Sequence, residues 1–229
     1  RICVESMTCD DLKKLFPVYV STDYFRGSLT IRETDLQAKV KEVVWTNSDF
    51  QNIEQKIVKD MTSFFQMAGA EDIFYHDCDG IMIFEEGGQK YMFFSELKST
   101  FDAHDIYQAK DQIISSYLKI NMLLNLLPNY KTEDYIVKGF IFSYPPNSSY
   151  IYELNRARYL AKKSKYKTES EFILDLCHWG KSTKLTPLSC HKLKGLPLGD
   201  RGVFQEIEIF HIQVPKNDSS ITLDVQNYI

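Results

Sequence analysis

The chain has 229 residues, 44% of them hydrophobic and 25% charged, and a formal net charge of −4. This composition is typical of a globular protein, and no apolar run approaches the roughly 20 residues that a membrane span needs, which argues against an integral membrane protein. The net negative charge argues against a general polyanion binder. Five scattered cysteines without a CxxC pair favour reduced thiols in the cytoplasm over a disulfide framework.

Helical spacing dominates the first part of the chain. Residues 8–17 resemble a short capped helix, and apolar residues recur at three- and four-residue steps through residues 33–45. We therefore interpret residues 1–47 as an N-terminal helical segment. A capping-box pattern at Ser48 and a second apolar stripe predict a longer helix from there to Gln66.

The hydrophobic period changes to two after this helix. Short runs rich in β-forming residues predict three strands, at 72–76, 80–84 and 90–97. A long helical stripe then fills residues 102–127, and the apolar run 135–144 is interpreted as a buried strand closed by two prolines. The order helix, three strands, helix, strand indicates an α/β fold with a mixed central sheet flanked by helices.

The last part of the chain, residues 147–229, is expected to pack on a core formed by residues 48–146. Amphipathic patterns predict helices at 150–163 and 169–179, both within a basic region. Residues 204–214 alternate as in a strand with one solvated face. The polar tail that follows is expected to be peripheral.

Acidic side chains gather at one end of the predicted hairpin of residues 77–99. Asp79 precedes its first strand, and Glu96 and Lys98 share a face at the end of the second, because side chains alternate along a strand. Pairing the two strands would place two carboxylates and an ammonium at one sheet end, where charge is costly to bury without a partner or a metal. Asp77 shares the face of Asp79, but the glycine after Asp79 would allow close approach by a backbone or a phosphate, which favours Asp79.

This arrangement suits the hydrolysis of phosphodiester bonds. Asp79 and Glu96 carry the oxygen ligands that Mg²⁺ (or Mn²⁺) prefers, and such a metal polarises a phosphoryl oxygen and lowers the pKa of a bound water. Lys98 is placed to position the water and to neutralise charge on the phosphorus. The sequence therefore predicts a metal-dependent catalytic site at Asp79, Glu96 and Lys98.

The same residues resemble the motif of the PD-(D/E)xK nuclease superfamily. Asp79, a strand, a turn and the run Glu96-Leu97-Lys98 match that motif, although Cys78 stands where it has proline. The resemblance covers the middle of the chain and implies a restriction-endonuclease-like core with a C-terminal helical and β extension. It implies a divalent-metal-dependent endonuclease, acting first of all on DNA, in restriction or anti-phage defence. RNA cleavage by the same fold, or a catalytically silent nucleic-acid-binding or scaffold module, are the alternatives.

Further site residues follow from this resemblance alone. The main-chain carbonyl of Leu97 would be a third metal ligand. Glu54 is the candidate for an acidic residue that such enzymes often carry on the helix before the sheet. Gln112, in preference to Gln108, is the candidate for a glutamine on the helix after the lysine. Besides a DNA substrate, the expected partners are a second copy of the chain or another protein of a defence complex.

A basic segment lies outside this core. From residue 150 to residue 201 there are eleven Lys and Arg against five Asp and Glu. Lysine and arginine neutralise phosphates, and interleaved tyrosines can pack on sugars or bases, so this surface is a candidate for nucleic-acid binding. An ordinary solvated face is the alternative. The candidate binding residues are Arg156, Arg158, Lys162, Lys163, Lys165 and Lys167.

Two Cys-His pairs, Cys177-His178 and Cys190-His191, resemble a zinc site at first sight. Adjacent ligands within each pair lack the spacer residues that zinc sites use. Cys177 also falls on the apolar face of a predicted helix, so a buried thiol is the preferred interpretation.

Overall fold

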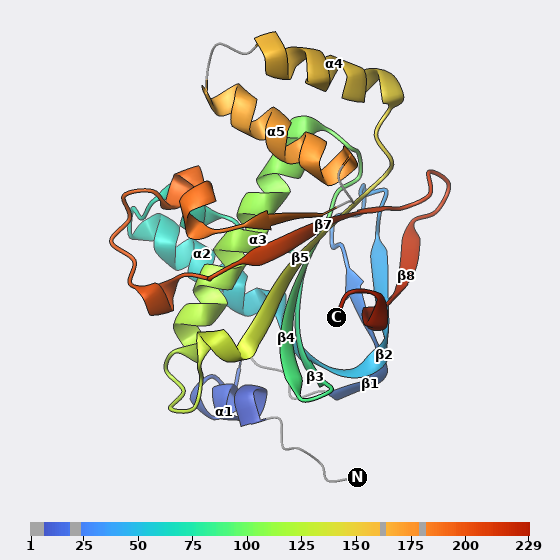
Figure 1. Cartoon of the computed structure of the whole chain (residues 1–229). Helices are drawn as coiled ribbons and strands as arrows, with labels where there is room; N and C mark the ends of the chain where they lie inside the picture. The colour runs from blue at the N-terminus through green and yellow to red at the C-terminus, as the bar shows by residue number, and fades with distance from the viewer. Residues whose placement is uncertain (1–6, 19–23, 161–163, 179–181) are drawn as a thin grey trace.

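The structure, a computed structural model, describes residues 7–18, 24–160, 164–178 and 182–229 of the chain. Its centre is a mixed eight-stranded sheet flanked by helices (Figure 1). The strands are β1 (Tyr24–Arg32), β2 (Glu42–Ile53), β3 (Gly80–Glu86), β4 (Gln89–Leu97), β5 (Tyr135–Ser143), β6 (Ser182–Leu185), β7 (Ile207–Gln213) and β8 (Ser220–Asp224). The α-helices are α1 (Met7–Leu15), α2 (Gln55–Met67), α3 (Ala103–Leu124), α4 (Ser148–Leu160) and α5 (Ser164–His178).

The sheet combines an antiparallel half with a parallel half. Neighbouring strands follow the order β1-β2-β3-β4-β5-β7-β6, and β8 pairs in parallel with β2. Strands β1 to β4 pair antiparallel, whereas β5 is parallel to both β4 and β7. Helix α3 connects β4 to β5, because parallel strands need a crossover rather than a tight turn.

Helices α2, α3 and α5 cover one face of the sheet. Along α3, buried side chains recur at helical spacing, including Ile113, Tyr117, Ile120 and Leu124. They belong to the same core cluster as Phe94 of β4 and residues of α2 and α5. Removing this apolar surface from water holds α3 against this face of the sheet.

The curved edge of the sheet itself covers the opposite face. Strands β1, β2 and β8 bend around this face, and the C-terminal turn lies inside the curve (Figure 1). Trp45 is fully buried there, with its ring centroid 5.5 Å from Phe93, 4.7 Å from Phe140 and 5.7 Å from Tyr228. All three contacts are edge-to-face, the arrangement that aromatic quadrupoles favour.

Residues 24–53 form β1, a loop and β2, so the prediction of a helix at residues 33–45 was wrong. Val43 and Trp45 are buried and alternate with more exposed neighbours in β2, while Leu36, counted in the helical stripe, is 90% exposed. Asn47 has φ 68° at an irregularity of the β1–β2 pairing, and the strand continues past it to Ile53 instead of ending at a helix cap. The proposed boundary at residue 47 falls inside β2.

Two further elements differ from expectation. Residues 72–76 do not form a strand: Asp72–Tyr75 is a short 3-10 helix, in which the consecutive residues Ile73 and Phe74 are both buried. The C-terminal tail is not peripheral, since β8 joins the sheet and a second 3-10 turn, Val225–Asn227, follows it. Further short 3-10 turns are Thr132–Asp134, Pro187–Ser189, His191–Leu193 and Asp200–Gly202.

The remaining predicted elements are confirmed in their type. These are the 77–99 hairpin, the long helix after it, the apolar strand β5, the two helices beyond it and strand β7. The α/β class with a mixed sheet flanked by helices is likewise confirmed. In the part of the chain that the structure describes, no helix combines the length and apolar character needed to cross a bilayer.

Candidate functional site

The charged residues of the hairpin meet at the end of the sheet where β4 terminates and β3 begins. The β3–β4 register pairs Gly80 with Ser95, and the amide of Asp79 donates to the carbonyl of Ser95 at 3.0 Å. Asp79 is thereby brought beside Glu96. The amide of Lys98 donates to the carbonyl of Phe142 on β5 at 2.7 Å, which fixes the main chain just beyond β4. The register of three strands therefore assembles the three residues.

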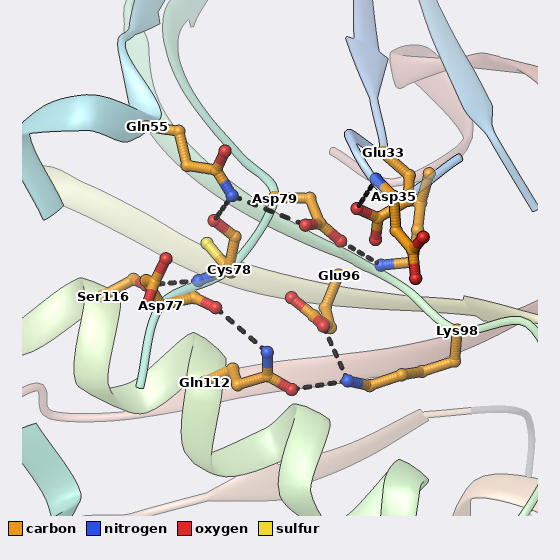
Figure 2. A network of polar contacts seen from close by, with 11 residues as sticks. Glu33, Asp35, Gln55, Asp77, Cys78, Asp79, Glu96, Lys98, Gln112 and Ser116 are labelled. Atoms are coloured by element: carbon orange, nitrogen blue, oxygen red, sulfur yellow. Dashed lines mark hydrogen bonds and ion pairs between the residues drawn. The ribbon is translucent and has the colours of Figure 1, made fainter. Parts of the chain in front are cut away.

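Asp79 is held by groups from β4 and from α2 (Figure 2). Its Oδ2 accepts a hydrogen bond from the amide of Leu97 at 2.7 Å, and its Oδ1 lies 3.5 Å from Nε2 of Gln55. The same Gln55 Nε2 donates to the carbonyl of Cys78 at 3.1 Å. The carboxylate of Asp79 is thus oriented from two sides.

Lys98 lies between the second carboxylate and the long helix. Its Nζ is 2.8 Å from Oε1 of Glu96 and donates to Oε1 of Gln112 at 2.7 Å. Gln112 in turn donates through Nε2 to the main-chain carbonyl of Asp77 at 3.0 Å. Figure 2 shows this chain of contacts running from Glu96 through Lys98 and Gln112 to the segment that carries Asp79. The structure therefore places Gln112 in contact with Lys98, while its catalytic role stays a prediction.

Both carboxyl groups have pKa values raised above the ordinary range. For Asp79, removal from water raises the pKa from 3.8 to about 7, while the hydrogen bond from the Leu97 amide acts in the opposite direction. The pKa of Glu96 is raised well above its ordinary value, first by burial and then by the neighbouring charge of Asp79, while Lys98 lowers it. Two buried carboxyls side by side therefore hold protons more readily than usual unless further positive charge is supplied.

The surroundings of Glu96 fit a divalent cation. The side chain of Glu96 is 3% exposed, and among the described residues its Oε2 has no hydrogen-bond partner. A buried carboxylate oxygen without a partner carries a substantial desolvation cost, which a hard cation bound by Asp79 and Glu96 would offset. The described residues contain no cluster of three or more His, Cys, Asp or Glu suited to a metal ion, so these two carboxylates would be joined by main-chain oxygens or water. The ligand role of the Leu97 carbonyl stays a prediction.

Helix α2 contributes Gln55, which the sequence analysis missed. Glu54 precedes the first residue of α2 instead of lying within the helix, and the polar contacts with the Asp79 segment come from the neighbouring Gln55. The role of Glu54 stays a prediction. Because the helix was expected to begin at Ser48, the special position of Gln55 at the helix start was hidden.

Glu33 was also missed. Its negative charge raises the pKa of both Asp79 and Glu96, and Figure 2 shows it on the side of Asp79 facing away from Gln112. Glu33 follows β1, in a loop that is linked to the end of β4 by a 2.9 Å hydrogen bond from the amide of Lys39 to Oγ of Ser99. The incorrect helix at residues 33–45 concealed this proximity.

Asp77 lies away from Glu96, in keeping with the preference for Asp79, whereas Gly80 has a role other than the one expected. The charge of Asp77 acts on Lys119, and its carbonyl accepts from Gln112, so Asp79 is the carboxylate that faces Glu96. The space beside Gly80 is filled by the side chain of Ile31: a Cβ on Gly80 would lie 2.5 Å from Cδ1 of Ile31. Packing, not approach by a phosphate, therefore explains this glycine.

The basic segment is described only in part. Arg156 is exposed on α4. The main chain of Arg158, Lys165 and Lys167 lies in α4 and α5, but their side chains are outside the description, and Lys162 and Lys163 lie outside the described residues. Helix α4 is tied to the start of α3 by a 2.7 Å hydrogen bond from the amide of Ala103 to the hydroxyl of Tyr150. Nucleic-acid binding by this segment stays a prediction.

Among the described residues, three cysteines are free thiols whose pKa values are raised by burial. Cys78, Cys177 and Cys190 are free, and burial raises the pKa of Cys177 and of Cys190 to about 11. The side chain of His178 lies outside the description.

Comparison with protein-family models, with curated proteins and with solved structures found no match for this chain. The function is therefore inferred from the site itself.

Proposed function

We propose that this chain is a divalent-metal-dependent endonuclease that hydrolyses phosphodiester bonds in DNA. The observation that carries the proposal is the pairing of two carboxyl groups, Asp79 and Glu96, with Lys98 2.8 Å from Glu96 at a sheet end. Burial leaves one oxygen of Glu96 without a hydrogen-bond partner among the described residues, as expected of a carboxylate that binds a cation.

Each residue has a role in this proposal. Asp79 and Glu96 would hold Mg²⁺ or Mn²⁺, with the Leu97 carbonyl as a further oxygen ligand. When bound, the metal polarises the phosphoryl oxygen and lowers the pKa of a water ligand. Lys98 orients the attacking water and offsets the charge that develops on the phosphate, and Gln112 holds the lysine ammonium in place.

The order of elements supports a restriction-endonuclease-like core in part. The hairpin β3–β4, then α3, then β5 parallel to β4, agrees with the arrangement that the PD-(D/E)xK resemblance implies. The other neighbour of β3 differs from that arrangement. It is the antiparallel strand β2, which comes before α2 in the chain, whereas the resemblance implies three strands after the helix. We propose a variant of that core, acting in restriction or anti-phage defence, alone or with a partner protein.

The test is cleavage of plasmid DNA and of a structured RNA by the purified protein with Mg²⁺ or with EDTA. We expect Mg²⁺-dependent nicking of DNA that is lost in EDTA and in Lys98→Ala. Lys90→Ala is the matched control, because Lys90 belongs to the same strand pair at its far end. Equal cutting by Lys98→Ala and the wild-type protein would overturn the assigned site.

Two other results would redirect the proposal. Cleavage of RNA with intact plasmid would change the substrate and leave the site assignment in place. A salt-sensitive gel shift on DNA, without cleavage of either polymer at any Mg²⁺ or Mn²⁺ concentration, would support the silent binding module instead.

A further inference from the structure

We propose that Ser116 and Lys119 are positioning residues that, together with Gln112, fix the main chain of residues 76–78 and thereby the carboxylate of Asp79. The three side chains lie on one face of α3, at positions i, i+4 and i+7, which an α-helix brings into line. The effect on catalysis rests on the proposed function, whereas the contacts that fix residues 76–78 do not depend on it.

The segment that leads to Asp79 lies between two regular elements. The 3-10 helix ends at Tyr75 and β3 begins at Gly80, so residues 76–79 belong to neither. The first contact with the strand ladder is the hydrogen bond from the amide of Asp79 to Ser95. Buried main-chain groups before that point need other partners, because leaving them unpaired costs free energy.

Side chains of α3 supply those partners. The carbonyl of Asp77 accepts from Nε2 of Gln112 at 3.0 Å, and the amide of Cys78 donates to Oγ of Ser116 at 2.9 Å. The carbonyl of His76 accepts from Nζ of Lys119. Three successive residues are thus each hydrogen-bonded to the same helix. Helix α3 therefore fixes the position of residues 76–78, which lead to Asp79.

Lys119 is costly to keep at this place. Its side chain is fully buried, and Nζ donates to the His76 carbonyl and to Oγ1 of Thr62, neither of which carries a negative charge. Burial lowers the pKa of Lys119 to about 8, although the charge of Asp77 acts in the opposite direction. An apolar side chain would pack here without that cost. The hydrogen bonds of Lys119 therefore explain why a lysine occupies this position.

The helix also joins the two halves of the site. Gln112 bonds at once to the Asp77 carbonyl and to Nζ of Lys98, which contacts Glu96. A shift of residues 76–78 relative to α3 would change the separation of Asp79 from Lys98 and Glu96. Partners of this indirect kind typically change metal affinity or activity by roughly 10- to 100-fold when removed.

The experiment compares Ser116→Ala with Ser115→Ala. Ser115 is the adjacent residue, equally buried, and among the described residues its Oγ has no hydrogen-bond partner. Mn²⁺ affinity is measured without DNA by electron paramagnetic resonance, and hydrogen exchange is followed at the amides of Cys78 and Asp79. We expect Ser116→Ala to weaken Mn²⁺ binding by on the order of tenfold and to speed exchange at both amides, with Ser115→Ala close to wild type.

Lys119→Met is the second variant, in case Ser116→Ala fails to fold. It keeps most of the side-chain volume and removes the donor to His76, and we expect the same losses from it. Equal Mn²⁺ affinity and equal amide exchange in the positioning variants and in Ser115→Ala would overturn the inference. If the wild-type protein binds Mn²⁺ but cuts nothing, the proposed function fails and this comparison still applies; if it binds no Mn²⁺, the amide exchange alone decides.

Discussion

At the scale of single residues, Gln112 is the side chain on which the site geometry depends most directly. Its amide oxygen accepts from Lys98 and its amide nitrogen donates to Asp77, so one planar group joins the end of β4 to the segment before β3. Replacement by leucine would keep the volume and remove both hydrogen bonds. Lys98 would then keep only its contact with Glu96, and its ammonium would be less firmly fixed.

We expect Gln112→Leu to lower the rate of DNA cleavage by roughly 10- to 100-fold, because the lysine would no longer be fixed beside the reacting phosphate. Plasmid nicking at saturating Mg²⁺ measures it. Gln108→Leu, one helical turn earlier, is the matched control and should stay within a few-fold of wild type. Equal losses in the two variants would argue against the assigned role of Gln112.

The raised pKa of Asp79 predicts how stability depends on pH. The unfolded carboxyl releases its proton near its ordinary pKa of 3.8, whereas the folded one holds it until about pH 7. Between these values the folded state binds more protons, so the free energy of unfolding falls as pH rises, by up to about 1.4 kcal/mol per unit. The stabilising contribution of the protonated Asp79 carboxyl is fully present below pH 3.8 and is lost above about pH 7.

Denaturant unfolding in EDTA from pH 4 to pH 8 checks this prediction. We expect Asp79→Asn to flatten the decline, since an amide does not titrate, although Glu96 contributes in the same direction. Added Mg²⁺ should stabilise the wild-type protein more at pH 8 than at pH 5, because the metal competes with protons for the carboxylates. A slope that is unchanged in Asp79→Asn would contradict the assignment.

At the scale of elements, β1 packs closely against the start of β3, at the glycine that follows Asp79. A Cβ on Gly80 would lie 2.5–2.7 Å from three side-chain atoms of Ile31, a distance at which either this side chain or one of the strands must shift. We expect Gly80→Ala to lower the free energy of unfolding by about 1–3 kcal/mol, as overpacking does. Gly199→Ala is the control, because a Cβ there meets no atom within 4 Å.

A double-mutant cycle with Ile31→Ala isolates this contact. Removing the isoleucine side chain makes room for the new methyl group, so the double variant should lose less stability than the sum of the single variants. Additive losses would show that the cost of Gly80→Ala has another origin.

The elements around the site could be predicted from the sequence because their patterns are local. The β3–β4 hairpin has two runs rich in β-forming residues around a glycine turn, and α3 carries a long apolar stripe. The carboxylates and the lysine followed from the hairpin, and Gln112 from the helix after it. Ser116 could have been found by the same period, since it lies one turn beyond Gln112.

The strand β2 could not be recognised in this way. Val40, Val43 and Val44 recur at steps that also fit a helix. The strand is favoured because it buries Trp45 against Phe93 and Phe140, which lie far away in the sequence. Pairing with β8 adds a contact that no local pattern contains. Gln55 and Glu33 were missed for this reason, because each depends on where β2 and its loop run.

At the scale of the whole molecule, the C-terminus completes the layer opposite the helices. The Tyr228 ring lies 5.7 Å from Trp45, 5.2 Å from Phe140 and 5.3 Å from Phe210, all centroid distances. The main-chain carbonyl of Tyr228 also accepts a hydrogen bond from Lys138 of β5. The last residues therefore join β2, β5 and β7, strands that lie on both sides of the β3–β4 hairpin.

We expect Tyr228→Ala to lower the free energy of unfolding by about 1–3 kcal/mol, because three edge-to-face contacts and the burial of the ring are lost while the main-chain bond to Lys138 is kept. Denaturant unfolding measures the change, and Ile229→Ala, at a neighbouring side chain that is 42% exposed, is the control. Since Tyr228 lies on the sheet face opposite α3, the loss of stability should leave Mn²⁺ affinity within a few-fold of wild type. A large drop in Mn²⁺ affinity at unchanged stability would instead mean that the two faces of the sheet are coupled through β5.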